Sequence, residues 1–183
     1  MKVSIVRMTI GELQRLPDDG NRYELIDGEL YVSPAPRMKH QRISSDLHDW
    51  LSPFAKKHKL GQVYHAPCDV FAEPEAQTCV QPDLLFISQD RLYIVREEGV
   101  FGPPDLVVEI VSESTYKADT TDKRDLYRRS GVAEYWIVNP EQRSILVYRF
   151  AESPEPRTLT AGETLSTPLL PGLEIPLSSL FVE

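Results

Sequence analysis

Three residues that lie far apart in the chain combine the chemical types found at divalent-metal sites. Asp83 lies near the start of one apolar run, residues 82–87, and Glu109 lies inside a second, residues 105–111. Carboxylates on neighbouring strands can share a Mg²⁺ ion, because this hard cation prefers oxygen ligands. Lys123 adds an ammonium group that can neutralise developing charge or orient water. Together the three residues predict a metal site in one small cleft, suited to cleaving phosphodiesters.

Glu109 carries the strongest individual signal, because its neighbours in the strand are apolar. Side chains alternate between the two faces of a strand, so Asp105, Val107 and Glu109 are expected to share one face. Burial of an unpaired carboxylate costs several kcal/mol. Glu109 must therefore be protonated, bound to a metal or paired with a base, and a purely structural ion pair stays open.

The expected partner of Glu109 is Lys123, in a helix predicted over residues 118–130. Leu126 and Tyr127 follow Lys123 by three and four residues, which places all three on one inward stripe of the helix. A lysine that faces the core needs a negative partner. Glu109 lies on the strand directly before this helix and can supply it.

A second Pro-Asp pair makes Asp105 a rival to Asp83. Asp105 lies four residues from Glu109 on one extended strand, which separates them by about 13 Å at ~3.3 Å per residue. One ion cannot bridge that distance. Asp83 is therefore preferred, and Asp105 is expected to accept hydrogen bonds at the start of its strand.

The apolar pattern predicts an α/β fold built on a central sheet. An N-terminal hairpin is expected at residues 22–33, turning at Asp27-Gly28. Residues 38–57 have helical spacing, with Pro53 able to kink or interrupt the helix. The strands of the central sheet are expected at residues 62–72, 82–88, 105–111, 134–138 and 145–150.

The two ends of the chain are expected to be peripheral. Thr9 and Glu12 are spaced for a capping box at the start of a short helix. Short strand-like pieces at 157–160 and 173–175 predict a C-terminal β meander packed on the sheet. With 183 residues, 41% of them hydrophobic, residues 1–183 are expected to form a single domain.

Composition excludes several classes of protein. No segment reaches the ~20 apolar residues of a membrane helix, and the N-terminus does not have the pattern of a signal peptide. Cys68 and Cys79 lack the spacing of a zinc site or redox pair and are expected to be free thiols. We therefore expect a cytoplasmic protein with no membrane partner.

Basic residues gather in three segments, 37–42, 56–59 and 123–129, although the whole chain has a formal charge of −8. This charge opposes tight nonspecific binding of nucleic acid, which usually goes with a basic excess. Most basic runs are solvated faces. In the last segment, Asp125 and Arg129 are spaced for an exposed ion pair.

The order of these segments resembles the PD-(D/E)XK nuclease superfamily. More closely, the chain resembles a bacterial family of proposed restriction endonucleases, formerly catalogued as a domain of unknown function. The resemblance implies a restriction-endonuclease-like fold, with a central mixed β-sheet flanked by helices, an N-terminal hairpin and a C-terminal β meander. The matching segments are 23–30, His40, 81–83, 104–112, Lys123 with Tyr127, Gly131-Val132 and 134–136.

One position departs from the simplest motif of the superfamily. Val111 stands two residues after Glu109, where that motif has lysine. The resembling family moves the lysine to the following helix, which matches Lys123. Lys117 is a poorer substitute because it lies nearer the loop and outside the inward stripe.

The resemblance implies a Mg²⁺- or Mn²⁺-dependent endonuclease that hydrolyses phosphodiester bonds, in DNA rather than RNA. Asp83 and Glu109 would bind the metal. Glu24 would support the metal or a water, and Lys123 would stabilise charge on the attacked phosphate. Many proteins with this fold pair symmetrically on duplex DNA, so a homodimer is expected.

Four residues are expected to contact nucleic acid at the rim of the cleft: Arg37, Lys39, His40 and Arg124. His40 opens the helix at 38–57 and could contact a phosphate, a site carboxylate or solvent.

The alternative is an inactive accessory protein that binds nucleic acid or protein and retains the fold. Glu109 and Lys123 would then form only a buried ion pair. The formal charge of −8 favours this alternative. Asp83, which such a pair does not require, favours the nuclease.

Overall fold

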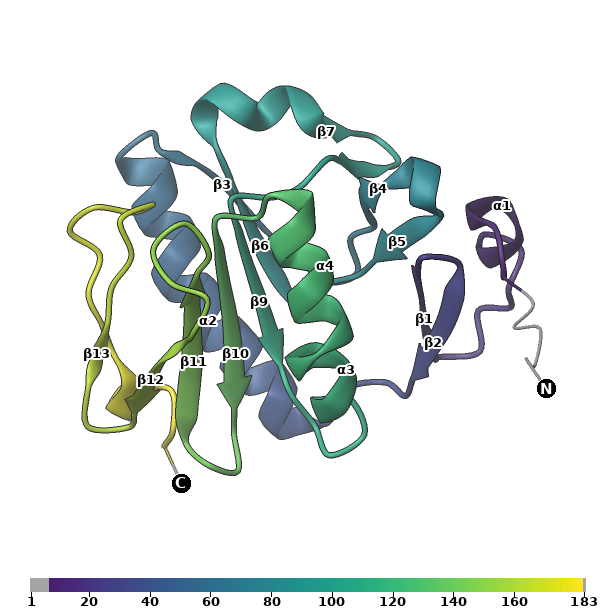
Figure 1. The fold of residues 1–183 in the computed structure, drawn as a ribbon. Coiled ribbons are helices and arrows are strands. Elements are labelled where there is room, and N and C mark those ends of the chain that lie inside the picture. Colours follow the sequence, from purple (N-terminus) through teal and green to yellow (C-terminus); the bar gives the residue numbers. More distant parts are fainter. Residues whose placement is uncertain (1–6, 183) are drawn as a thin grey trace.

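A six-stranded mixed sheet forms the centre of the molecule and confirms the expected fold class. The computed structural model describes residues 7–182 (Figure 1). In spatial order the strands are β12 (Arg157–Thr160), β11 (Ser144–Arg149), β10 (Glu134–Asn139), β9 (Leu106–Ile110), β6 (Leu84–Ser88) and β3 (Gly61–His65). Strand β9 runs parallel to β10 and antiparallel to β6. The strands that follow Asp83 and contain Glu109 are thus direct neighbours.

Helices cover both faces of this sheet, as the side-chain alternation requires. Helix α2 (Met38–Lys57) lies behind the sheet and α4 (Asp122–Ser130) in front of it (Figure 1). Val108 and Ile110 of β9 pack in the same cluster as α2, whereas Val107 packs in the cluster that includes α4. Glu109 therefore points towards α4.

A second sheet carries the N-terminal hairpin. Its strands, in spatial order, are β2 (Glu29–Ser33), β1 (Arg22–Ile26), β5 (Thr78–Val80), β4 (Val70–Glu73), β8 (Gly99–Phe101) and β7 (Val95–Arg96). Asp27 and Gly28 both have positive φ, 53° and 77°. This is the two-residue hairpin turn expected of an Asp-Gly pair.

The C-terminal segment packs on the α2 side of the central sheet. Strands β13 (Thr164–Leu165) and β14 (Ile175–Pro176) pair with each other, and η3 (Leu177–Ser179) follows them. Leu170, Leu173 and Phe181 lie in the same buried cluster as α2. Two further short 3-10 helices are η1 (Pro74–Ala76) and η2 (Gln89–Ile94). The capping box of Thr9 and Glu12 is present at α1 (Ile10–Leu13).

Two predicted elements are interrupted. The strand expected at 62–72 is two strands, β3 and β4, which belong to different sheets. Pro67 lies between them and has no amide hydrogen to donate to a sheet ladder. The helix expected at 118–130 is α3 (Tyr116–Thr120) followed by α4, because Thr121 leaves the helical conformation with φ −122° and ψ −78°.

Helix α2 continues through Pro53 without the interruption that the sequence allowed. Cys68 and Cys79 are free thiols. Among the helices of residues 7–182, none is both long and apolar enough to cross a membrane.

The close packing of β3 against β6 gives a test of this part of the fold. Gly61 has φ 151°, and a Cβ there would meet the Ile87 carbonyl oxygen and lie 2.8 Å from Cε2 of Phe86. Gly61→Ala should therefore lower the free energy of unfolding by about 1–3 kcal/mol. Gly162→Ala is the matched control, because a Cβ there meets nothing within 4 Å. Urea denaturation of both variants checks this, and equal midpoints would contradict the packing described.

Candidate active site

Strand register places Asp83 beside Glu109. Leu84 pairs with Val108 across β6 and β9, so the preceding Asp83 and the following Glu109 come to the same edge of the sheet. The Ile110 amide donates a hydrogen bond of 2.8 Å to Oδ2 of Asp83. The two carboxylates thus come from adjacent strands, as the sequence predicts.

Lys123 reaches the same place from α4. Its Nζ lies 2.9 Å from Oε2 of Glu24, 3.0 Å from Oε1 of Glu109 and 3.5 Å from Oδ1 of Asp119. Glu24 is held in turn, because its Oε1 accepts a hydrogen bond of 2.8 Å from the Gln81 amide. The ammonium group therefore joins β1, β9 and α3.

Two members of the cluster, Asp119 and Arg22, were missing from the sequence-based prediction, and a third, Tyr127, was placed only on the inward stripe of its helix. Asp119 precedes Lys123 by four residues, which is the helical spacing of a facing pair and could have identified it. Arg22 lies 3.0 Å from Oδ1 of Asp83 and shares a strand face with Glu24. The Tyr127 hydroxyl donates a hydrogen bond of 3.0 Å to Oε1 of Glu109.

Both carboxylate oxygens of Asp83 have partners. Oδ1 pairs with Arg22, and Oδ2 lies 2.9 Å from Nε2 of His40. His40 is thus part of the site and not a solvated histidine. Burial opposes ionisation of Asp83, but the hydrogen bond from His40 and the charge of Arg22 together lower its pKa.

The pKa values around Lys123 reflect an excess of acids. Burial disfavours the ammonium charge, yet Glu109, Glu24 and Asp119 raise the Lys123 pKa well above its usual value. Burial raises the pKa of Glu109 to about 8, and the charges of Asp119, Asp83 and Glu24 add to the rise while Lys123 opposes it. Burial also raises the pKa of Asp119.

The charge balance favours uptake of a cation. Four acids, Glu24, Asp83, Glu109 and Asp119, surround two permanent bases, Lys123 and Arg22. The four acids and Lys123 are only 2–4% exposed, so solvent does little to screen them. The surplus negative charge can be relieved by a proton on Glu109 or by a metal ion.

The donor atoms suit a hard divalent cation. The described hydrogen bonds to the Glu109 side chain both end on Oε1, which leaves Oε2 available within residues 7–182. No group of three acid, histidine or cysteine side chains in this part of the chain forms a ready-made metal cage. Mg²⁺ does not require one, since it is commonly held by one or two carboxylates together with water and substrate phosphate. Asp83 would have to exchange one of its present partners.

The four acids and Lys123 of the cluster are almost fully buried. The side chains of Arg22 and His40 are each 17% exposed, more than any of the four acids. They mark the side of the cluster that faces solvent. A ligand that reaches the cluster from solvent therefore meets Arg22 and His40 first.

The other predicted contact residues differ in their surroundings. Arg37 is the N-cap of α2, and Lys39 directly precedes His40. Arg124 instead pairs with Asp125 at 2.7 Å and interacts with Tyr148 of β11.

Two further expectations concern ion pairs outside the cluster. The pair expected between Asp125 and Arg129 is absent among the described residues, because Arg129 bridges Asp27 and Glu73. Asp105 accepts a hydrogen bond from the Ser88 amide and pairs with Arg91 at 2.7 Å. Its role at the start of its strand is as predicted.

Comparison with known proteins agrees with this fold. A crystal structure from Anabaena variabilis ATCC 29413, described as "a putative nuclease belonging to DUF820", superposes with a TM-score of 0.79. The match covers 95% of this chain and 97% of the other, at 19% sequence identity. At this identity the likeness establishes a shared fold.

The sequence also matches a family model. Residues 10–178 match the model of the Uma2 family, which is described as "Putative restriction endonuclease". The chain belongs to this family. No curated protein matches the sequence.

The ionisation of Glu109 predicts how stability depends on pH. Its pKa is raised from 4.5 to about 8, so the stability that it contributes below pH 4.5 is lost as the pH rises to about 8. Glu109→Gln removes this ionisation. Relative to wild type, the free energy of unfolding of the variant should rise by on the order of 1–3 kcal/mol between pH 4.5 and about 8, as measured by urea denaturation.

Glu113→Gln, an exposed acid on the loop after β9, is the control and should track wild type at each pH. A loss of ~3–5 kcal/mol for Glu109→Gln at every pH would instead identify a structural ion pair.

Proposed function

We propose that this protein is a metal-dependent endonuclease that hydrolyses phosphodiester bonds. The observation that carries the proposal is the meeting of Asp83 and Glu109 at one sheet edge, with Lys123 bonded to Glu109. Two carboxylates and a lysine at one point are the groups that bind a metal and stabilise charge on a phosphate. Membership of the Uma2 family supports the same activity.

Asp83 and Glu109 would hold Mg²⁺ or Mn²⁺, and the Ile110 carbonyl could add a backbone ligand. The ion would act as a Lewis acid on the phosphate and lower the pKa of a bound water. Lys123 would place its ammonium group against the attacked phosphate. Glu24 would hold Lys123 in position through their contact of 2.9 Å.

Arg22 and His40 would act at the solvent side of the cluster. Both contact Asp83, and both are more exposed than the acids they face. They can orient the Asp83 carboxylate and offer hydrogen-bond donors to an approaching phosphate. DNA is the proposed substrate, and a homodimer is the proposed assembly on a duplex; both rest on the family resemblance.

The accessory-protein alternative has two observations in its favour. Three carboxylates neutralise Lys123 without any metal, and the whole chain has a charge of −8. That arrangement does not account for Asp83, whose contacts are to Arg22, His40 and the Ile110 amide. A second carboxylate beside Glu109 is what a metal site needs.

Substitution of the two carboxylates separates these functions. Asp83→Asn and Glu109→Gln should each reduce Mg²⁺- or Mn²⁺-dependent nicking of plasmid DNA by at least the ~10–100-fold typical of outer-shell partners, because each removes a proposed metal ligand. Asp105→Asn is the matched control: it also follows a proline and has a basic partner, but lies at the other end of β9. It should retain activity at temperatures where all variants are folded.

Equal nicking by wild type and both site variants would indicate a contaminating nuclease. That outcome would remove the catalytic assignment and leave the accessory protein as the better account.

A further inference from the structure

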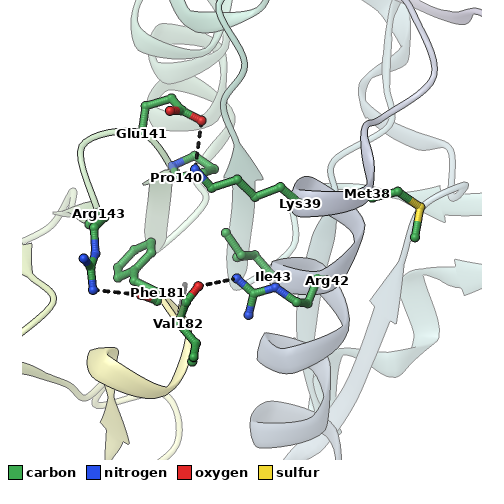
Figure 2. A pocket seen from close by; sticks show the side chains of 9 residues that line it. All are labelled: Met38, Lys39, Arg42, Ile43, Pro140, Glu141, Arg143, Phe181 and Val182. Carbon is green, nitrogen blue, oxygen red and sulfur yellow. Dashed lines mark hydrogen bonds and ion pairs between the residues drawn. The ribbon is translucent and has the colours of Figure 1, made fainter.

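A groove lies between the start of α2, the turn after β10 and the C-terminal segment (Figure 2). Its volume is about 710 Å³. Three basic side chains line it, from Lys39, Arg42 and Arg143. Of its apolar lining residues, Ile43, Pro140 and Phe181 are buried, whereas Val182 is 57% exposed. The groove thus places basic side chains beside an exposed apolar one.

The charge of the groove is opposite to that of the whole chain. Glu141 is the acidic residue in its lining, against three bases, whereas the chain carries −8. Glu141 pairs with Lys39 at 2.9 Å, but the two side chains are 85% and 50% exposed. Exposed pairs contribute little and exchange readily for another anion.

The two arginines are held in place yet keep donors free. Arg42 donates to the Val182 carbonyl, and Arg143 donates to the Phe181 carbonyl (Figure 2). Arg42 also donates to Asp46. A guanidinium group has five N–H donors. The bonds found within residues 7–182 leave further donors on both groups, so a phosphate can bind without breaking them.

The groove opens at the same sheet edge as the acidic cluster. Lys39 directly precedes His40, whose Nε2 lies 2.9 Å from Asp83. Pro140 directly follows β10, which is parallel to β9 and therefore ends at the edge where Glu109 lies. A strand of nucleic acid bound at the cluster can thus continue past the first turn of α2 into the groove.

We propose that this groove binds a DNA strand next to the cleavage site. Arg42, Arg143 and Lys39 contact its phosphates, and a base packs against Val182, the exposed apolar side chain beside Arg42. The assignment rests on the proposed nuclease function for the placement of the strand, whereas binding itself requires only the groove.

The test measures binding without cleavage. A fluorescently labelled single-stranded DNA of about 12 nucleotides is titrated with the full chain in EDTA at about 50 mM salt, where phosphate contacts are strong. The double variant Arg42→Gln with Arg143→Gln should bind at least ~10-fold more weakly. The slope of log affinity against log salt concentration should become shallower by about 0.7 for each phosphate that the variant no longer neutralises.

Two single variants test the sign of the charge without disturbing the arginine contacts to the backbone. Lys39→Gln should weaken binding, and Glu141→Gln should strengthen it, because each alters an exposed side chain in the groove. Arg157→Gln is the control: Arg157 is 72% exposed, lies on β12 and does not line the groove. It should bind as wild type does.

Absence of binding by wild type, or equal affinity for all variants, overturns the proposal. Binding that depends on the groove residues without any Mn²⁺-dependent cleavage supports the groove and overturns the nuclease. Mn²⁺-dependent cleavage together with binding that is unchanged in the groove variants supports the nuclease and overturns the groove. The two proposals therefore fail independently.

Discussion

The burial of one ammonium group governs the arrangement of this fold. Lys123 is 4% exposed, and an isolated charge at that depth would be strongly disfavoured. It is stabilised by Glu24, Glu109 and Asp119, which come from β1, β9 and α3. The hairpin, the central sheet and the helical segment before α4 are thereby fixed around a single point.

The acids that stabilise this ammonium group leave the cluster with an excess of negative charge. Three acids around one lysine leave negative charge in surplus, and Asp83 adds a fourth. Arg22 offsets part of it through Asp83, and burial beside the other acids raises the pKa of Glu109, which favours a proton there. A metal ion bound at such a site would displace that proton.

Local patterns in the sequence were enough to find the central residues. Alternation along β9 identified Glu109 as an acid among apolar neighbours, and helical spacing placed Lys123 on the inward face. The Asp27-Gly28 turn followed from the positive φ that a tight hairpin needs. These signals depend on residues a few positions apart, which is why they could be recognised directly.

Contacts between distant segments were beyond such patterns. Arg22 and Asp83 are 61 positions apart, and nothing in the periodicity of either strand pairs them. The break at Thr121 was also missed. The Thr121 hydroxyl donates a hydrogen bond of 2.6 Å to the Lys117 carbonyl, and such local side-chain bonds compete with a continuous helix. The burial of the cluster depends on the packing of β1, β9 and α3 around Lys123, which the sequence of one segment alone does not indicate.

Anomalous diffraction from crystals soaked in Mn²⁺ tests the central claim most directly. The account predicts one peak within about 2.5 Å of a carboxylate oxygen of Asp83 and of Glu109, with Arg22 or His40 withdrawn from Asp83 to admit the ion. Fully soaked crystals with no peak there, and with Asp83 still bonded to Arg22 and His40, would contradict it.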